Sequence, residues 1–103
     1  HVHDLARAIH TMISRKEPYE HPVANVASET QISVLEVVQC INQGLKKRTN
    51  MKAIVPRHGD TRQGDVMHSC GSAERIHKMI NWKAEISFEN GIGSLLENKE
   101  ERR

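Results

Sequence analysis

Two short apolar runs on either side of an amphipathic helix constrain the fold of this chain most strongly. Residues 23–27 and 51–55 have the length and residue types of buried strands, and Pro56 closes the second run. Between them, Ser33 and Glu36 have the spacing of a capping box, in which each side chain pairs with the other residue's backbone N–H. Such a succession predicts a right-handed crossover between parallel strands. We therefore expect an α/β fold, a small domain with a short parallel β-α-β unit and flanking helices.

Helical periodicity also marks the start of the chain. After an extended lead-in, Asp4 is placed to cap a helix whose apolar face holds Leu5, Ile9, Met12 and Ile13. His1 and His3 alternate and would lie on the same side of an extended segment, which is half of a metal site. No third ligand is fixed by the sequence, so we expect no metal.

The remaining helices are expected to follow serine caps. The helix opened by Ser33 should end at Gly44, a residue common at helix C-termini. Ser72 and Ser87 are each placed to cap a further helix. Lys46, Lys47 and Arg48 form the only tight basic run, which suits a helix C-terminus and solvent better than a phosphate backbone.

Length and composition fit one small domain that spans residues 1–103. The formal net charge of +2 is too small to indicate nucleic acid, and no apolar stretch is long enough to cross a membrane. Cys40 and Cys70 have neither metal-ligand spacing nor a disulfide framework, so a cytoplasmic protein is the default expectation. The chain does not begin with Met, which is typical of a piece of a longer protein.

The motif with the clearest chemistry is the turn Arg62-Gln63-Gly64-Asp65. Gly allows positive φ and a close approach of the backbone to a ligand, and Arg offers paired donors that match phosphate oxygens. Asp can accept from two sugar hydroxyls. Arg, Gly and Asp are also common in surface loops, so the motif by itself is interpreted as an ordinary surface turn. A second copy, Arg57-His58-Gly59-Asp60, precedes it.

In this order along the chain, several motifs resemble the C-terminal part of the extended short-chain dehydrogenases/reductases, the NAD-dependent epimerase/dehydratase family. The resemblance rests on His1-Val2-His3-Asp4-Leu5-Ala6, Asn25-Val26-Ala27-Ser28, Ser33-Val34-Leu35-Glu36-Val37-Val38, Arg62-x-Gly64-Asp65 with His68-Ser69, and Ser72-Ala73 through Asn81-Trp82-Lys83. UDP-sugar 4-epimerases are the most similar group. Glu29 departs from the pattern, since Gly is usual after the small-residue strand end, and Asn81 replaces another Gly.

The resemblance implies a role for the turn. Arg62 would bind the diphosphate of a UDP- or dTDP-linked sugar, and Asp65 would bind the ribose, with Ser69 as a further substrate contact. Arg57 is a second candidate, because the two Arg-x-Gly-Asp copies leave the register open. His68 is another, because it flanks the turn and could contact phosphate. Val66, His68 and Ser69 continue the family pattern after the second copy and favour it.

The resemblance also implies that the enzyme's cofactor machinery lies elsewhere. NAD serves the full-length family, whereas this chain has no Gly-rich fingerprint after a strand, and Gly91-x-Gly93 follows none. Tyr19 has Val23, not Lys, four residues on, so the Tyr-x-x-x-Lys pair is missing. We expect no catalytic residue and no cofactor bound by this chain alone, and either self-association or packing against a missing N-terminal cofactor domain. Two alternatives stay open: a free-standing domain that binds a nucleotide or a partner, and a remnant without function.

Overall fold

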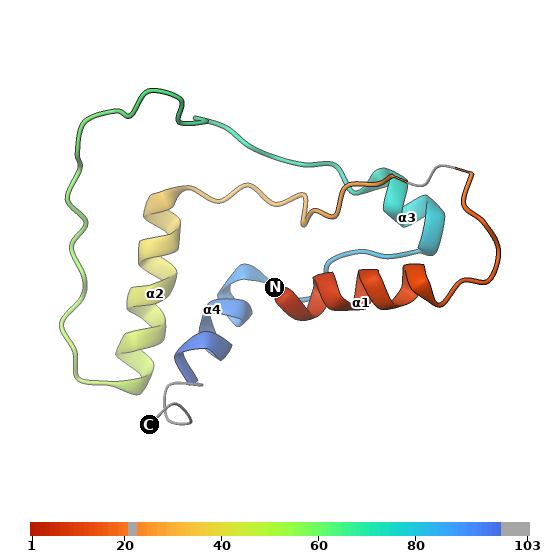
Figure 1. Ribbon diagram of the computed structural model, residues 1–103. Helices are drawn as coiled ribbons and strands as arrows, with labels where there is room; N and C mark the ends of the chain where they lie inside the picture. The colour runs from red at the N-terminus through yellow and green to blue at the C-terminus, as the bar shows by residue number, and fades with distance from the viewer. Residues whose placement is uncertain (21–22, 98–103) are drawn as a thin grey trace. The chain divides into compact units, whose positions relative to one another are not determined.

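The computed structural model describes residues 1–20 and 23–97, and its secondary structure there is helical (Figure 1). The helices are α1 (Val2–Ile13), α2 (Val34–Arg48), α3 (Glu74–Ile80) and α4 (Phe88–Glu97). The chain divides into two compact units. His1–Gln31 and Ser69–Ser87 form one, here called the α1/α3 unit, and Ile32–His68 and Phe88–Arg103 form the other, the α2/α4 unit.

The two predicted strand segments are irregular in the structure. Residues 23–27 belong to the α1/α3 unit and residues 51–55 to the α2/α4 unit, and no strand occurs in ranges 1–20 and 23–97. A strand exists only where a neighbouring strand pairs with its N–H and C=O groups. The β-α-β unit therefore stays a prediction for a chain in which each segment has a partner strand.

Helix α1 begins earlier than its sequence suggested, and Asp4 is not its cap. His1 is the N-cap, and its Nδ1 accepts from the His3 N–H at 3.2 Å. The extended lead-in was thus a wrong prediction, because the first turn is already helical and the rings of His1 and His3 meet edge to face at 5.0 Å. A cap lies just outside the helix, whereas Asp4 lies in the first turn, near the positive end of the helix dipole.

Asp4 instead joins α1 to the segment that follows α3. Its carboxylate is buried and accepts the N–H of Ile86 at 3.0 Å, the N–H of Glu85 at 3.2 Å and the Arg7 guanidinium at 3.1 Å. Its backbone carbonyl accepts the Trp82 indole N–H at 3.0 Å. Burial alone would raise the pKa of Asp4, but the hydrogen bonds from Ile86, Glu85 and Arg7 outweigh it and hold that pKa below its ordinary value.

The core of the α1/α3 unit forms around this junction. Ala8, Ala73, Ile76 and Trp82 are buried, and partly buried Met12, Ala24, Ile80 and Ala84 pack against them. The C-cap of helix α3 is Asn81, whose φ of 52° is the left-handed conformation usual for Gly at this position. The predicted apolar face of α1 was only partly right, since Met12 packs on the core while Leu5, Ile9 and Ile13 are exposed.

In the α2/α4 unit, the capping box of α2 is confirmed. The Glu36 N–H donates to Ser33 Oγ at 3.2 Å, and the Ser33 N–H donates to Glu36 Oε2 at 2.7 Å. Gly44 does not end the helix, which continues to Arg48. A Cβ at Gly44 would overlap Leu96 Cδ1, so this glycine permits close contact with α4 and is not a stop. Arg48 also pairs with Glu97 of α4 at 2.5 Å.

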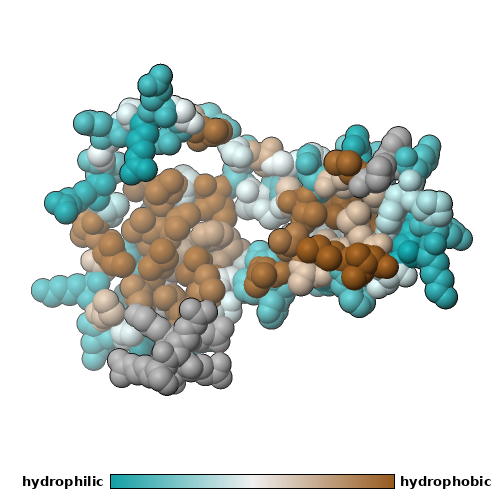
Figure 2. Space-filling view, viewed as in Figure 1, coloured by the Kyte–Doolittle hydropathy of each residue, from teal (hydrophilic) through white to brown (hydrophobic). Residues whose placement is uncertain are grey.

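Apolar side chains remain on the surface of both units, as the brown areas of Figure 2 show. Val2, Leu5, Ile9 and Ile13 line one side of α1, and the α2/α4 unit exposes Val34, Leu35, Ile54, Val55 and Leu95. The buried apolar cluster given above lies wholly in the α1/α3 unit. None of the helices described here is long and apolar enough to span a membrane.

Candidate functional site

The predicted clamp lies on the segment between α2 and α3, residues 49–73, here called the connector. Within it the Asp65 N–H donates to the Arg62 carbonyl at 3.3 Å, which closes a four-residue turn. Gly64 occupies the third position with a φ of 91°. A turn with positive φ at this position favours Gly, because a Cβ would be strained there. The sequence Arg-Gln-Gly-Asp thus forms a turn with Arg62 and Asp65 at its two ends.

The first copy of the motif has a different conformation. No backbone hydrogen bond joins Arg57 to Asp60 in the part of the chain that the structure describes, and Gly59 has no positive φ. A Cβ at Gly59 would meet nothing within 4 Å. The glycine at this position is therefore not required by its own backbone or by a neighbour, in contrast to Gly64. This difference favours Arg62 and Asp65 as the clamp, which stays a prediction.

All five candidate residues, Arg57, Arg62, Asp65, His68 and Ser69, have exposed side chains. None of these side chains forms a hydrogen bond or an ion pair with any of residues 1–20 and 23–97. Arg57 to His68 belong to the α2/α4 unit, and Ser69 begins the second part of the α1/α3 unit. The donors and acceptors of the candidate set are thus available to a ligand, and the set divides between the two units.

The sequence gave no signal for the residue that holds the upstream part of the connector. The Asn42 side chain, on α2, donates to the Ile54 carbonyl at 2.9 Å and accepts the Ile54 N–H at 2.7 Å. A side-chain amide that pairs with both the N–H and the C=O of one residue forms the two hydrogen bonds that a neighbouring strand would otherwise form with it. Asn42 therefore attaches Ile54, in the predicted strand segment, to α2 within the α2/α4 unit.

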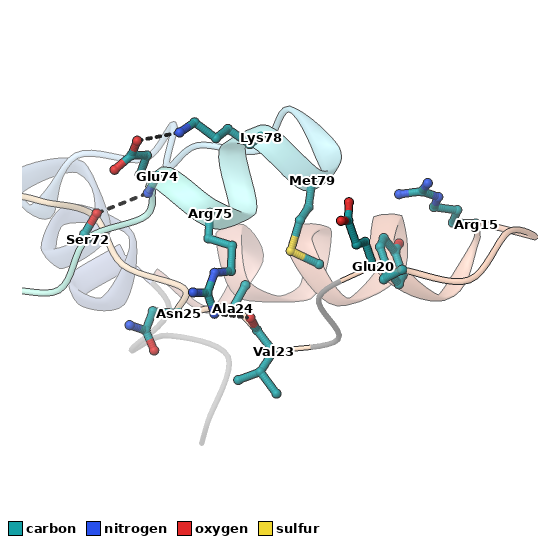
Figure 3. Close-up of a pocket in the computed structure, with 11 residues that line it drawn as sticks. Arg15, Glu20, Val23, Ala24, Asn25, Ser72, Glu74, Arg75, Lys78 and Met79 are labelled. Carbon is teal, nitrogen blue, oxygen red and sulfur yellow. Dashed lines mark hydrogen bonds and ion pairs between the residues drawn. The ribbon is translucent and has the colours of Figure 1, made fainter.

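A cavity of about 800 Å³ lies in the α1/α3 unit, but it contains none of the predicted site residues (Figure 3). Its cationic side chains are already engaged. Arg75 donates to the Val23 carbonyl at 3.1 Å, and Lys78 pairs with Glu74 at 2.6 Å. The Arg15 guanidinium lies 4.6 Å from the centre of the Tyr19 ring. These pairings leave no evident phosphate site in this cavity.

Gly91 and Gly93 lie inside α4, and Gly91 is buried there, so this pair is not the turn between a strand and a helix that binds a pyrophosphate. The Tyr19 hydroxyl donates to the Met12 carbonyl at 2.8 Å. Residues 1–20 and 23–97 bring together no group of three or more metal-ligating side chains.

One family model matches residues 1–95, and its description is GDP-mannose 4,6 dehydratase. No curated protein and no solved structure matches the chain. The match covers most of the chain, so the chain belongs to this family of NAD(P)-dependent nucleotide-sugar dehydratases and epimerases.

Proposed function

We propose that this member of the family is the nucleotide-sugar-binding portion of a UDP-sugar 4-epimerase-like enzyme, and that the connector holds the nucleotide diphosphate. Arg62 binds the diphosphate, Asp65 accepts from the ribose hydroxyls, and Ser69 makes a further substrate contact. The hydride and proton transfers belong to residues and a cofactor outside this chain. The chain alone is not catalytic.

The hydrogen-bonded turn at Gly64 is the observation that carries the proposal. It holds the backbone of Arg62 and Asp65 in one short turn, and neither side chain is paired within the described residues. A planar guanidinium forms two parallel hydrogen bonds to phosphate oxygens. The carboxylate is an acceptor that repels phosphate, so it suits the adjacent hydroxyl-bearing sugar. The turn thus presents complementary groups for the two parts of a nucleotide.

The identity of the nucleotide separates two versions of the proposal. The sequence motifs resemble those of UDP-sugar enzymes, whereas the matched family carries the name of a GDP-mannose dehydratase. Both versions use the same diphosphate contact and differ only in the base. UDP, dTDP and GDP therefore need to be compared on the same protein.

The test is a titration of labelled chain with each of these nucleotides, followed by amide NMR. One surviving charged contact and a partial pocket give a Kd of about 1 mM, which corresponds to roughly 4 kcal/mol. We expect UDP to shift the amide signals of residues 62–69 and Arg62→Ala to abolish these shifts. Arg57→Ala is the matched control, since it removes the same side chain from the copy without a turn.

Two outcomes would contradict the proposal. Shifts centred on residues 57–60 that persist in Arg62→Ala would show that the wrong copy was chosen. No shift with any nucleotide at several millimolar would favour the alternatives, a partner-binding domain or a remnant without function. A coupled assay with UDP-glucose, UDP-N-acetylglucosamine and NAD tests the non-catalytic role, and turnover above a buffer control would refute it.

A further inference from the structure

Residues 51–55 form an extended segment, although no strand among residues 1–20 and 23–97 pairs with it. Residues 49–62 contain neither a turn nor a bend, and Figure 1 shows this part of the chain as an extended trace beside α2. In such a segment the N–H and C=O groups of successive residues face opposite edges. Both groups of Ile54 are bonded to the Asn42 side chain. Asn42 therefore closes the edge that Ile54 faces, here called the closed edge.

The opposite edge, here called the open edge, is faced by Met51, Ala53 and Val55. The Met51 N–H donates to Thr49 Oγ1 at 3.2 Å. In the part of the chain that the structure describes, nothing forms a hydrogen bond with the N–H or C=O of Ala53 or Val55, and both residues are exposed. An unpaired row of this kind is a ready template for a strand of another chain.

The residues of this segment are complementary to themselves in one antiparallel register. With Ala53 opposite Ala53 of a second copy, Met51 lies opposite Val55 and Lys52 lies opposite Ile54. Met51 and Val55 are 60% and 82% exposed, and each then gains an apolar partner across the pair. No like charges are opposed. This register therefore covers exposed apolar side chains without placing two lysines together.

The backbone groups agree with the same register. The two Ala53 residues exchange N–H and C=O bonds, and the Val55 N–H of each copy donates to the Met51 carbonyl of the other. The Met51 N–H is already bonded to Thr49, so the ladder ends there. Pro56 has no N–H, but it faces the closed edge and removes no bond from the open one.

The closed edge determines the direction of pairing. Two antiparallel copies related by a twofold axis use the same edge of each strand, whereas two parallel copies use opposite edges. Parallel pairing would need the edge that Asn42 occupies. The same closure stops the pairing at two strands, because no edge is left for a third copy.

We propose that residues 51–55 are a self-association site, at which this segment pairs antiparallel with the same segment of a second copy, centred on Ala53. The contact is small, so the association is weak and transient. It lies wholly within the α2/α4 unit of each copy. It does not depend on the proposed nucleotide site.

Amide hydrogen exchange at two chain concentrations tests the site. A weak association with a Kd of about 0.1–1 mM is compared at about 20 µM and about 1 mM chain. Exchange at Ala53 and Val55 should slow about threefold or more at the higher concentration, because their N–H groups are then bonded across the pair. The amides of Lys52 and Ile54 face the closed edge and should not change. Association elsewhere on the chain does not produce this alternation.

Two substitutions at position 53 test the register. Ala53→Glu and Ala53→Lys each place like charges directly opposite one another, so each should abolish the concentration dependence at Val55. An equimolar mixture of the two variants opposes unlike charges and should restore it. Lys52→Glu is the matched control, because this side chain lies opposite Ile54 of the second copy. The concentration dependence should persist in that variant.

Four results would overturn the proposal. Protection of Ala53 and Val55 at both concentrations would indicate a partner in the same chain, such as residues 23–27 in the predicted parallel unit. An equal change at Lys52 would indicate association without strand pairing. A mixture of the two position-53 variants that behaves like either one alone would exclude this register. Unchanged exchange at all four amides would show that the open edge does not pair.

None of these results depends on nucleotide binding. The proposed function is tested separately by the UDP titration, so either proposal can fail while the other stands.

Discussion

Asp4 should be the residue on which the α1/α3 unit depends most. Asp4→Ala removes the acceptor of the Ile86 and Glu85 N–H groups and the partner of Arg7. Each backbone N–H that loses its acceptor in a part-buried position costs about 1–3 kcal/mol, and the pair with Arg7 adds less because the Arg7 side chain is 36% exposed. Asp4→Asn keeps one acceptor oxygen, so about 1–3 kcal/mol is expected.

The single tryptophan provides the assay. Trp82 is 2% exposed and its indole N–H donates to the Asp4 carbonyl, so its fluorescence reports on this unit during urea unfolding. Glu85→Gln is the matched control, since its carboxylate is 64% exposed and 3.5 Å from Arg7. Such a pair is worth at most about 1 kcal/mol. If Asp4→Asn unfolds at the same urea concentration as Glu85→Gln, the central role of Asp4 is refuted.

Three further predictions concern acid, helix packing and association. The pKa of Asp4 is lowered in the folded chain, so the stabilisation that the Asp4 carboxylate provides is complete above its unfolded pKa of about 3.9 and is lost as the pH falls through the folded pKa. Acid titration of Trp82 fluorescence should therefore show a smaller loss of stability for Asp4→Asn than for wild type. Gly44→Val should destabilise the α2/α4 contact by about 1–3 kcal/mol, because the added side chain overlaps Leu96. Gly59→Ala should have no measurable effect on urea unfolding. Equal effects of the two substitutions would contradict the close packing of Gly44 on Leu96. The exposed apolar side of α1 should promote self-association at micromolar concentration. Sedimentation should show more monomer when Ile9 is replaced by Lys. A wild-type chain that is already monomeric would contradict this prediction.

Local features of the fold were predictable because neighbouring residues determine them. The capping box of α2 needs only residues three apart, and the left-handed Asn81 needs only its own short side chain. The roles of Gly44 and Asp4 were predicted wrongly because residues far along the chain determine them. Their roles come from Leu96 and from Glu85 and Ile86, which are remote in sequence, and no local pattern reveals such partners.

The candidate site also has some features that the sequence predicted and others that it did not. The turn at Gly64 follows from the residues it contains, and its conformation is as the sequence suggested. The attachments of the connector at Ile54 and Ala73 were not foreseen, because Asn42 is an ordinary polar residue of a helix. Glu29 did carry a signal, a charged residue where the family pattern has Gly. The carboxylate of Glu29 accepts the Ala73 N–H at 2.7 Å, and this partner became visible only in the structure.

The affinity difference between UDP and uridine tests the central claim most directly. If Arg62 binds the diphosphate, wild type should bind UDP with a Kd of about 1 mM and uridine too weakly to measure, since a charged contact of about 1.5–3 kcal/mol is a factor of roughly ten or more. Arg62→Ala should remove this difference, and Arg57→Ala should preserve it. Equal affinity of wild type for UDP and uridine, or a difference that survives in Arg62→Ala, would contradict the account.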